Sequence, residues 1–247
     1  MNILIVGGLG RTAEPIIDLL YEANHSISLF DVSTSDSHSF HKNIKVIHGD
    51  ICKYGEINKA VRGIDIVIHL AVNVFDTKND ALSFQTNVFG TYNILRCALD
   101  NGVKKVMTAS SAPVHTLVKT HQADYICSAG EDFSYDLTKN IQELMAQKFS
   151  QTYAMNNLIL RLGHIVNGRN YTDLEGRPLS DLLYCRGGWV CKYDVAKAFC
   201  NAVETDFTGY HLINVIGSYQ AADRFDLSSC KKLINFECGE RFLEYGD

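Results

Sequence analysis

Proline, basic clusters and long apolar runs are all scarce in this chain of 247 residues. With only three prolines, the loops must be marked mainly by Gly, Asn, Asp and Ser. No apolar stretch approaches the roughly 18 residues that span a bilayer. No basic run exceeds two residues and the formal net charge is −5, which argues against nucleic acid as a partner. We therefore expect neither a membrane nor a nucleic-acid partner.

The patterns of zinc sites and exported proteins are missing as well. None of the eight cysteines forms a Cys-x-x-Cys pair or has zinc-ligand spacing with histidine, so no metal site is expected. The first apolar run has no basic stretch before it and is soon interrupted by glycine, which is typical of a core strand rather than a signal peptide. We expect a cytoplasmic protein with free thiols.

A glycine-rich turn directly follows that first apolar run. Gly7 allows a tight turn out of the strand, Gly10 lets backbone amides approach phosphate oxygens, and Ala13 is small enough for a helix to pack on the sheet. A helix N-terminus at this point favours a pyrophosphate. A second strand-like run, residues 26–30, ends in Asp31, where the ribose of NAD needs an acceptor for its 2′-hydroxyl. The pattern predicts an NAD site, although Asp31 could also simply end the strand.

Strand-like apolar runs alternate with helix-like segments, which is the pattern of a parallel α/β sheet. After the first run, the strand-like runs are 26–30, 44–47, 65–70, 105–108, 158–162 and 210–215, and the long helix-like segments are 81–100, 135–153 and 192–204. Apolar residues make up 46% of the chain and charged residues 21%, which predicts a folded globular protein.

We expect a doubly wound (Rossmann) α/β fold with a small C-terminal substrate-binding subdomain. Periodicity disappears over residues 164–188, and the residues from 218 onward are polar and mixed. We assign residues 1–163 and 189–217 to the NAD-binding domain. Residues 164–188 and 218–247 are predicted to form a cap over the carboxyl ends of the strands, where open α/β sheets bind ligands.

The spacing Tyr-x-x-x-Lys occurs twice, at Tyr135/Lys139 and at Tyr193/Lys197. Residues four apart lie on one face of a helix. A lysine ammonium beside a phenol favours the phenolate, which can take a hydroxyl proton during hydride transfer. Only the first pair opens a helix that follows a serine-bearing strand end, at Ser111. We therefore predict Tyr135 and Lys139 as catalytic and interpret Tyr193 as structural.

Further segments match motifs that occur together in one protein family. They are the glycine turn at residues 7–13; Gly49-Asp50-Ile51; His69-Leu70-Ala71; residues 87–95 (Asn-Val-Phe-Gly-Thr-Tyr-Asn-Ile-Leu); Ser110-Ser111-Ala112-Pro113-Val114; residues 135–139 with Glu143; Leu160-Arg161-Leu162; Asp194-Val195-Ala196; and Phe225-Asp226-Leu227-Ser228. With these motifs the chain resembles the extended short-chain dehydrogenase/reductases of the NAD-dependent epimerase/dehydratase group. The matches run in order through residues 1–235.

The resemblance implies a role for each matching position. The catalytic residues are then Tyr135 and Lys139 with Ser111, which orients the reacting oxygen. The NAD-binding residues are Gly7, Gly10, Arg11, Asp31, Asp50, Ile51, Leu70, Ala71, Asn87, Tyr135 and Lys139. The substrate-binding residues are Asn73, Ser111 and His164. We expect NAD rather than NADP because Asp31 repels a 2′-phosphate, whereas Arg11 is the feature that argues for NADP.

Departures from the family pattern narrow the function. Ala112-Pro113 stands where the sugar-nucleotide 4,6-dehydratases carry Asp-Glu, so dehydration is not expected. The segment that wraps a nucleotide is largely absent between Arg169 and Trp189, and this compactness is similar to the uronate dehydrogenases. We expect an NAD-dependent oxidoreductase that acts at a secondary hydroxyl or keto group of a small sugar, sugar acid or polyol. A nucleotide-sugar 4-epimerase that retains NAD and a non-catalytic dinucleotide sensor are the alternatives.

Two further features of the sequence leave alternatives open. Arg169, Arg177 and Arg186 could hold a carboxylate or phosphate of the substrate, or be solvated loop residues. Family members often pair their two long helices in a dimer, and apolar residues here could do so or could face the sheet. These residues are Phe84, Phe89, Tyr92, Leu137, Ile141, Leu144 and Met145. We expect a homodimer.

Overall fold

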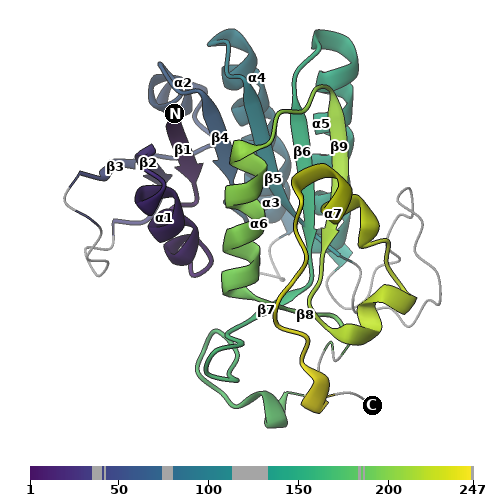
Figure 1. Ribbon diagram of the computed structural model, residues 1–247. Helices are drawn as coiled ribbons and strands as arrows, with labels where there is room; N and C mark the ends of the chain where they lie inside the picture. The colour runs from purple at the N-terminus through teal and green to yellow at the C-terminus, as the bar shows by residue number, and fades with distance from the viewer. Residues whose placement is uncertain are drawn as a thin grey trace.

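The computed structural model describes residues 1–34, 41, 43–73, 80–112, 133–182, 185 and 187–245. Seven parallel strands form one sheet in the order β3-β2-β1-β4-β5-β6-β9 (Figure 1). The strands are β1 (Asn2–Val6), β2 (Ser26–Asp31), β3 (Lys45–His48), β4 (Ile66–His69), β5 (Lys105–Ser111), β6 (Asn157–Leu162) and β9 (Tyr210–Val215). Because β1 lies between β2 and β4, the chain winds outward from it in both directions, which confirms the predicted doubly wound fold.

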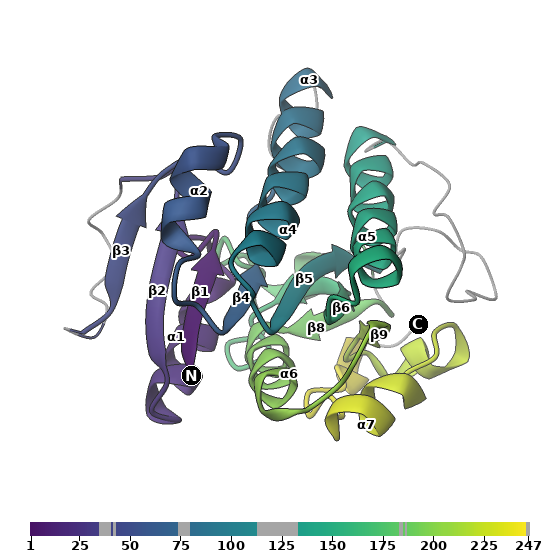
Figure 2. The same cartoon turned by 90° about the horizontal axis from the view of Figure 1, so that it is seen from above.

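Helices cover both faces of this sheet. Figure 2 shows α2, α4 and α5 on one side of the strands and α1, α6 and α7 on the other. The helices are α1 (Ala13–Glu22), α2 (Tyr54–Ala60), α3 (Asp80–Ser83), α4 (Thr91–Asp100), α5 (Phe133–Tyr153), α6 (Lys192–Glu204) and α7 (Ser228–Ile234). Within the described part of the chain, no helix combines the length and the apolar character that crossing a membrane requires.

The central strand β1 contributes to a hydrophobic core on each face of the sheet. Ile3 and Ile5 are fully buried on the side of α1 and α6, whereas Leu4 and Val6 are fully buried on the side of α4, against Ile94 and its neighbours. Successive side chains of a strand point to opposite faces. A parallel strand that is covered on both faces therefore needs an apolar residue at every position, and this first apolar run meets that requirement.

The helix predicted over residues 81–100 includes a π-helical stretch, Phe84–Gly90, between α3 and α4. A Cβ on Gly90 would lie 2.4 Å from Cδ1 of Ile51, so the glycine lets this helix pack directly on the loop after β3. π-Helical turns are frequent at functional sites. Hydrophobic periodicity predicts a helix here but does not distinguish this wider turn from an α-helix.

Two short strands form a separate small sheet. β7 (His164–Val166) pairs in parallel with β8 (Trp189–Cys191). Three short 3₁₀ turns, Leu179–Asp181, Tyr219–Asp223 and Leu243–Tyr245, complete the regular structure of this region. Figure 1 shows β7 and β8 at the lower edge of the main sheet, together with the C-terminal segment.

The C-terminal segment and α7 pack in different places. Phe242 is buried with Trp189 in a cluster that also holds Val166, Leu179 and Cys191. In α7, by contrast, Cys230 and Ile234 belong to the same core cluster as the side chains of α1 and α6. The division of the chain into an NAD-binding domain and a cap stays a prediction.

Candidate cofactor and active site

A cavity of about 1010 Å³ opens at the carboxyl ends of the central strands. Thirteen of the fourteen predicted site residues line it: Gly7, Gly10, Arg11, Asp31, Asp50, Ile51, Leu70, Ala71, Asn73, Ser111, Tyr135, Lys139 and His164. Ligands of open α/β sheets bind at the point where the strand order reverses, which is the gap between β1 and β4. The cavity lies at this edge, so the structure gathers the predicted residues in one place.

The glycine turn has the backbone that a pyrophosphate site needs. Gly7 has a φ of +81°, and a Cβ at this position would lie 2.5 Å from the amide nitrogen of Ala71. The Gly10 amide donates to the carbonyl of Gly7 (3.1 Å), and the Ala13 amide donates to the carbonyl of Gly10 (3.0 Å), where α1 begins. The turn therefore leads into the N-terminus of a ten-residue helix, where phosphates are favoured. These residues fit the pyrophosphate of NAD.

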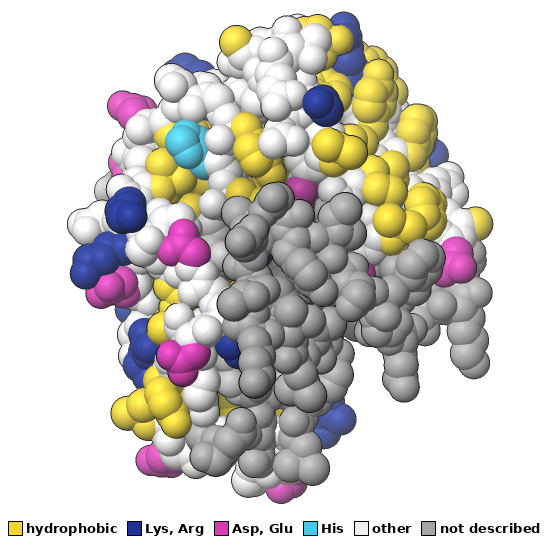
Figure 3. Space-filling model, turned by 90° about the vertical axis from the view of Figure 1, so that its right-hand side faces the viewer, with side chains coloured by type: hydrophobic (Ala, Val, Ile, Leu, Met, Phe, Trp, Pro, Cys, Tyr) yellow, Lys and Arg dark blue, Asp and Glu magenta, His cyan; other side chains and the backbone are white. Residues whose placement is uncertain are grey.

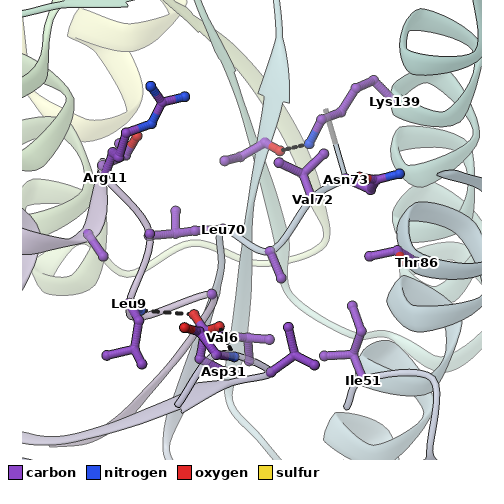
Figure 4. A pocket seen from close by; sticks show the side chains of 18 of the residues that line it. Val6, Leu9, Arg11, Asp31, Ile51, Leu70, Val72, Asn73, Thr86 and Lys139 are labelled. Atoms are coloured by element: carbon purple, nitrogen blue, oxygen red, sulfur yellow. Dashed lines mark hydrogen bonds between the residues drawn. The ribbon is translucent and has the colours of Figure 1, made fainter. Parts of the chain in front are cut away.

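The carboxylate of Asp31 joins the end of β2 to the glycine turn. Its Oδ2 accepts a hydrogen bond from the Leu9 amide and its Oδ1 accepts one from the Ser33 amide, both at 2.9 Å (Figure 4). Each carboxylate oxygen can accept two hydrogen bonds. Asp31 thus holds the strand end and still has acceptor capacity facing the cavity, so the structural and the ribose-binding interpretations are compatible.

At another wall of the cavity lie Asp50 and Ile51. The Asp50 amide donates to Oε2 of Glu56 and its Oδ1 accepts from the Cys52 amide, both at 2.8 Å. These two contacts fix the loop after β3 and leave Ile51 packed against Gly90.

Asn87 is the predicted NAD-binding residue that does not line the cavity. Its side chain is fully buried, and its Oδ1 accepts from the Asn73 amide (2.7 Å). Its Nδ2 donates to the Asn73 carbonyl (3.2 Å) and to Oγ1 of Thr138 (3.0 Å). Asn87 therefore joins the loop after β4 to α5 and positions Asn73 at the cavity. Direct contact of Asn87 with the cofactor stays a prediction.

Tyr135, Lys139 and Ser111 meet at the wall formed by α5 and β5. The Nζ of Lys139 donates to the carbonyl of Ala109 (2.8 Å) and lies 5.8 Å from the centre of the Tyr135 ring. Figure 4 shows the lysine reaching across this wall beside Val72 and Asn73. Burial lowers the pKa of Lys139 to about 8, although the nearby Glu143 carboxylate acts in the opposite direction.

Ser111 makes one long side-chain contact with the described residues. Its Oγ is 3.5 Å from the Ala112 carbonyl, which is long for a hydroxyl donor. A hydroxyl in this state can turn toward a bound oxygen. The cluster can therefore hold a substrate hydroxyl, take its proton and stabilise the resulting charge with the lysine ammonium.

Part of the insertion after β7 reaches the glycine turn. Arg11 forms an ion pair with Glu175, both side chains being about half exposed, and Leu174 lines the cavity. The buried carboxylate of Asp173 accepts from the amides of Glu175 (2.9 Å) and Arg177 (2.8 Å) and so shapes this segment. We name residues 173–177 the strap. No periodic pattern in residues 164–188 predicts this contact.

Two of the three arginines for which anion binding was one of two open interpretations, Arg169 and Arg177, have other partners in the structure. The Arg169 guanidinium stacks 3.5 Å from the centre of the Tyr193 ring, and Arg177 pairs with Asp173 (2.5 Å). Neither arginine nor Tyr193 is among the described residues that line the cavity. Arg186 lies outside the described residues.

Sequence reasoning also missed a buried polar group beneath the wall formed by α5 and β5. Ser110, Glu143 and Arg161 are joined by hydrogen bonds. The one available signal was the spacing of Glu143, which lies four residues after Lys139 and so on the same helix face.

Two known proteins illustrate the sequence similarity. L-arabinose 1-dehydrogenase (NAD(P)(+)) of Haloferax volcanii is 22% identical over 232 residues, which cover 88% of each chain. The human sterol-4-alpha-carboxylate 3-dehydrogenase, decarboxylating, is 24% identical over 110 residues, which are 44% of this chain and 29% of that protein. The chain therefore matches less than a third of the length of this second relative.

The fold and the family are both supported by these comparisons. A solved structure of a mutated uronate dehydrogenase superposes with a TM-score of 0.76 at 17% identity, covering 97% of this chain and 82% of that one, which supports the same fold. Residues 3–183, well over half of the chain, match the sequence model of an NAD-dependent family. The chain belongs to the NAD dependent epimerase/dehydratase family.

Proposed function

We propose that the chain is an NAD-dependent dehydrogenase of a small sugar, sugar acid or polyol, acting at a secondary hydroxyl or keto group. One observation carries this proposal: a single cavity is lined both by the glycine turn with Asp31 and by the cluster of Ser111, Tyr135 and Lys139. A cofactor site alone would suit a sensor. A proton-transfer cluster in the same cavity is what hydride transfer at a hydroxyl needs.

The residues of the cluster have distinct tasks in this proposal. Ser111 donates a hydrogen bond to the reacting oxygen and fixes its orientation. Tyr135, as the phenolate, takes the hydroxyl proton, and the ammonium of Lys139 stabilises the phenolate. Bound NAD supplies the hydride acceptor. In the reverse direction the Tyr135 phenol returns the proton to the carbonyl oxygen.

Asp31 is the residue that we propose to select NAD over NADP. Its carboxylate faces the cavity from the end of β2 and would repel a 2′-phosphate. Arg11, the residue that favoured NADP, is engaged in the ion pair with Glu175. In Figure 4 it lies away from Asp31, which argues against its use as a 2′-phosphate ligand.

A free, small substrate is supported by the sequence relatives. L-arabinose 1-dehydrogenase is similar to this chain over 88% of both lengths, so its compact layout is shared. The alternative of a nucleotide-sugar 4-epimerase requires NAD to stay bound between turnovers. The strap is tied to the glycine turn by the ion pair of Arg11 and Glu175, which is exposed and hence weak. A weak tie at this point is compatible with a cofactor that exchanges, as in a dehydrogenase.

Thermal unfolding with a ligand panel tests this proposal, because a ligand that binds only the folded state raises its stability. The panel holds NAD, NADP, free sugars, uronates and UDP-sugars, and each sugar is also assayed with NAD for NADH formation. We expect stabilisation by NAD and turnover of a free sugar. The matched variant Asp31→Asn keeps a side-chain oxygen for the Leu9 amide but removes the charge. It should reduce the difference between the stabilisation by NAD and the stabilisation by NADP.

Each other outcome of the panel favours a different function. Stronger stabilisation by NADP contradicts the cofactor assignment. Stabilisation by UDP-sugars alone, with no NADH formed, favours the epimerase. Stabilisation by NAD without any response to sugars favours the dinucleotide sensor.

We also propose that the protein forms a homodimer through α4 and α5. Several large apolar side chains of this region are well exposed: Phe84 (38%), Phe89 (50%), Tyr92 (45%) and Leu144 (53%). Figure 3 shows hydrophobic side chains gathered on the upper right of the molecule, on the side where these helices lie. Light scattering at micromolar concentration should give twice the chain mass of 27.6 kDa, whereas a mass of 27.6 kDa would contradict the dimer. A cytoplasmic location stays a prediction.

A further inference from the structure

A buried carboxylate lies one helical turn beyond Lys139. Glu143 is on the same face of α5, and its side chain is 9% exposed. Its Oε1 accepts hydrogen bonds from Oγ of Ser110 (2.6 Å) and Nε of Arg161 (2.9 Å), and its Oε2 accepts one from Nη2 of Arg161 (2.7 Å). The guanidinium and the carboxylate thus form a two-pronged ion pair in the interior, which fixes the orientation of both groups.

These hydrogen bonds join the three elements around the catalytic wall. Ser110 directly precedes Ser111 at the end of β5, Arg161 lies in the neighbouring strand β6, and Glu143 shares α5 with Tyr135 and Lys139. A buried ion pair is weak evidence for stability, since apolar side chains of similar volume often replace one without loss. What a carboxylate adds here is a fixed orientation and a negative charge.

The charge of Glu143 acts on a buried lysine. Burial lowers the pKa of Lys139 from 10.5 to about 8, and the Glu143 carboxylate is the group that opposes this shift. His69 of β4 is near Lys139 as well, but burial lowers its pKa to about 3, so it is neutral and adds no positive charge. Without Glu143, the lysine would lose the one negative charge among the described residues that favours its ammonium form.

We infer that Glu143 is a positioning residue of this site. It holds the Ser111 end of β5 against the face of α5 that carries Tyr135 and Lys139, and it favours the ammonium form of Lys139. Arg161 holds the Glu143 carboxylate in place. The inference rests on the proposed function, because it assumes that Tyr135 and Lys139 do the chemistry.

Other titratable groups around this pair must be included in any test that varies pH. In the part of the chain that the structure describes, the groups that face Lys139 or Glu143 are Tyr135 on α5, His69 on β4, Arg161 on β6 and Tyr210 on β9. Burial and the Glu143 carboxylate raise the pKa of Tyr210 far above its ordinary value, so it stays neutral over the accessible range. The test follows Lys139, whose pKa burial lowers to about 8.

Two variants separate charge from stability. Glu143→Gln removes the charge but takes the Glu143 carboxylate away from the buried guanidinium of Arg161, which destabilises the fold. The double variant Glu143→Gln with Arg161→Met removes both charges and keeps the site filled. We expect it to fold and to move the alkaline limb of the kcat/KM profile by about one pH unit toward lower pH, because the charge of Glu143, rather than that of Arg161, acts on the pKa of Lys139. Glu237→Gln, which removes an exposed carboxylate paired with Lys231, is the control and should leave the limb unchanged.

A second readout does not depend on activity. The free energy of unfolding is measured against pH for the double variant with and without Lys139→Met, and the same comparison is made in the wild-type background. In each background, the curve of the protein with Lys139 and the curve of its Lys139→Met variant approach each other once Lys139 loses its proton. This approach should begin at a lower pH in the double-variant background, because the pKa of Lys139 is lower there. If the curves begin to approach at the same pH in the wild-type and the double-variant backgrounds, the inference is overturned. Absence of any turnover would instead count against the proposed function, and the unfolding curves would still decide the role of Glu143.

Discussion

The spacing Tyr-x-x-x-Lys occurs on two helices whose surroundings are opposite. On α5, Lys139 is 5% exposed, its Nζ donates to the Ala109 carbonyl, and it lines the cavity together with Tyr135. On α6, Lys197 is exposed to solvent, and Tyr193 is partly buried beneath the stacked guanidinium of Arg169. The same local sequence spacing therefore gives two different chemical environments.

The difference shows that the chemical environment of a Tyr-x-x-x-Lys pair depends on what its helix face packs against. The face of α5 that carries Tyr135 meets the carboxyl ends of β5 and β6, where backbone carbonyls and buried side chains remove water from the lysine. That desolvation lowers the pKa of Lys139 to about 8. On α6 the tyrosine packs in the cluster of Trp189 and Phe242, away from the cavity.

The largest effect is expected from removing the two tyrosine hydroxyls in turn. Tyr135→Phe should lower turnover by about 10²-fold or more, the usual scale for losing a general acid or base. Tyr193→Phe should leave turnover within a few-fold, because its ring still stacks on Arg169. Steady-state kinetics with a substrate found in the ligand panel measures both variants.

Binding of NAD is the control for this pair of variants, because Tyr135→Phe keeps the ring at the cofactor site and removes only the hydroxyl that transfers the proton. Titration of each variant with NAD should give affinities close to the wild type. A severe loss of turnover in Tyr193→Phe, with Tyr135→Phe near wild type, would reverse the assignment of the two pairs.

The sequence predicts those parts of the site whose residues lie close together in the chain, and it misses contacts between residues that are far apart in the chain. The glycine turn, Asp31 and the Tyr135 helix follow from local spacing, and the structure brings them to one cavity as expected. The buried position of Asn87 was not predicted, because its partners lie 14 and 51 residues away in the chain. The same holds for the pair of Arg11 and Glu175, which are 164 residues apart and follow no periodic pattern.

The buried groups set a second limit on prediction. Spacing places Glu143 on the face of Lys139, but only the fold brings Arg161 and Ser110 to its carboxylate. The π-helical stretch Phe84–Gly90 is another case, since it keeps the apolar pattern of a helix while widening one turn. Such features depend on packing between strands and helices that are distant in the chain.

A smaller effect is expected on stability when the two lysines are replaced by methionine. Lys139 has a folded pKa of about 8 against an ordinary value of 10.5, so the unfolded chain binds its proton more tightly. The cost of burying the charged lysine destabilises the folded protein fully below pH 8 and disappears above pH 10.5. The free energy of unfolding of the wild type therefore increases as pH rises between these two values. Lys139→Met should therefore be the more stable protein at neutral pH, by an amount on the order of 1 to 3 kcal/mol.

Urea unfolding at several pH values measures this difference. The advantage of Lys139→Met should shrink between pH 8 and 10.5. Lys197→Met is the matched control on α6 and should show no such pH dependence, because its side chain is exposed. Parallel curves for Lys139→Met and wild type over this range would contradict the buried ammonium.

The smallest effect is expected at the ion pair that ties the strap to the glycine turn. Arg11 and Glu175 are 46% and 50% exposed, whereas Arg161 and Glu143 are 8% and 9% exposed. Exposed pairs contribute about 0 to 1 kcal/mol, so Glu175→Gln should change the free energy of unfolding by less than about 1 kcal/mol. Glu143→Gln, which strands a buried guanidinium, should cost about 3 to 5 kcal/mol. Urea unfolding measures the free energy for both variants. Because salt screens an exposed ion pair, Glu175→Gln should also make the rate of NADH release less sensitive to salt, as measured by stopped-flow fluorescence. A loss of several kcal/mol in Glu175→Gln would mean that the strap is part of the folded core rather than an opening over the cofactor, and would favour an enzyme that retains NAD.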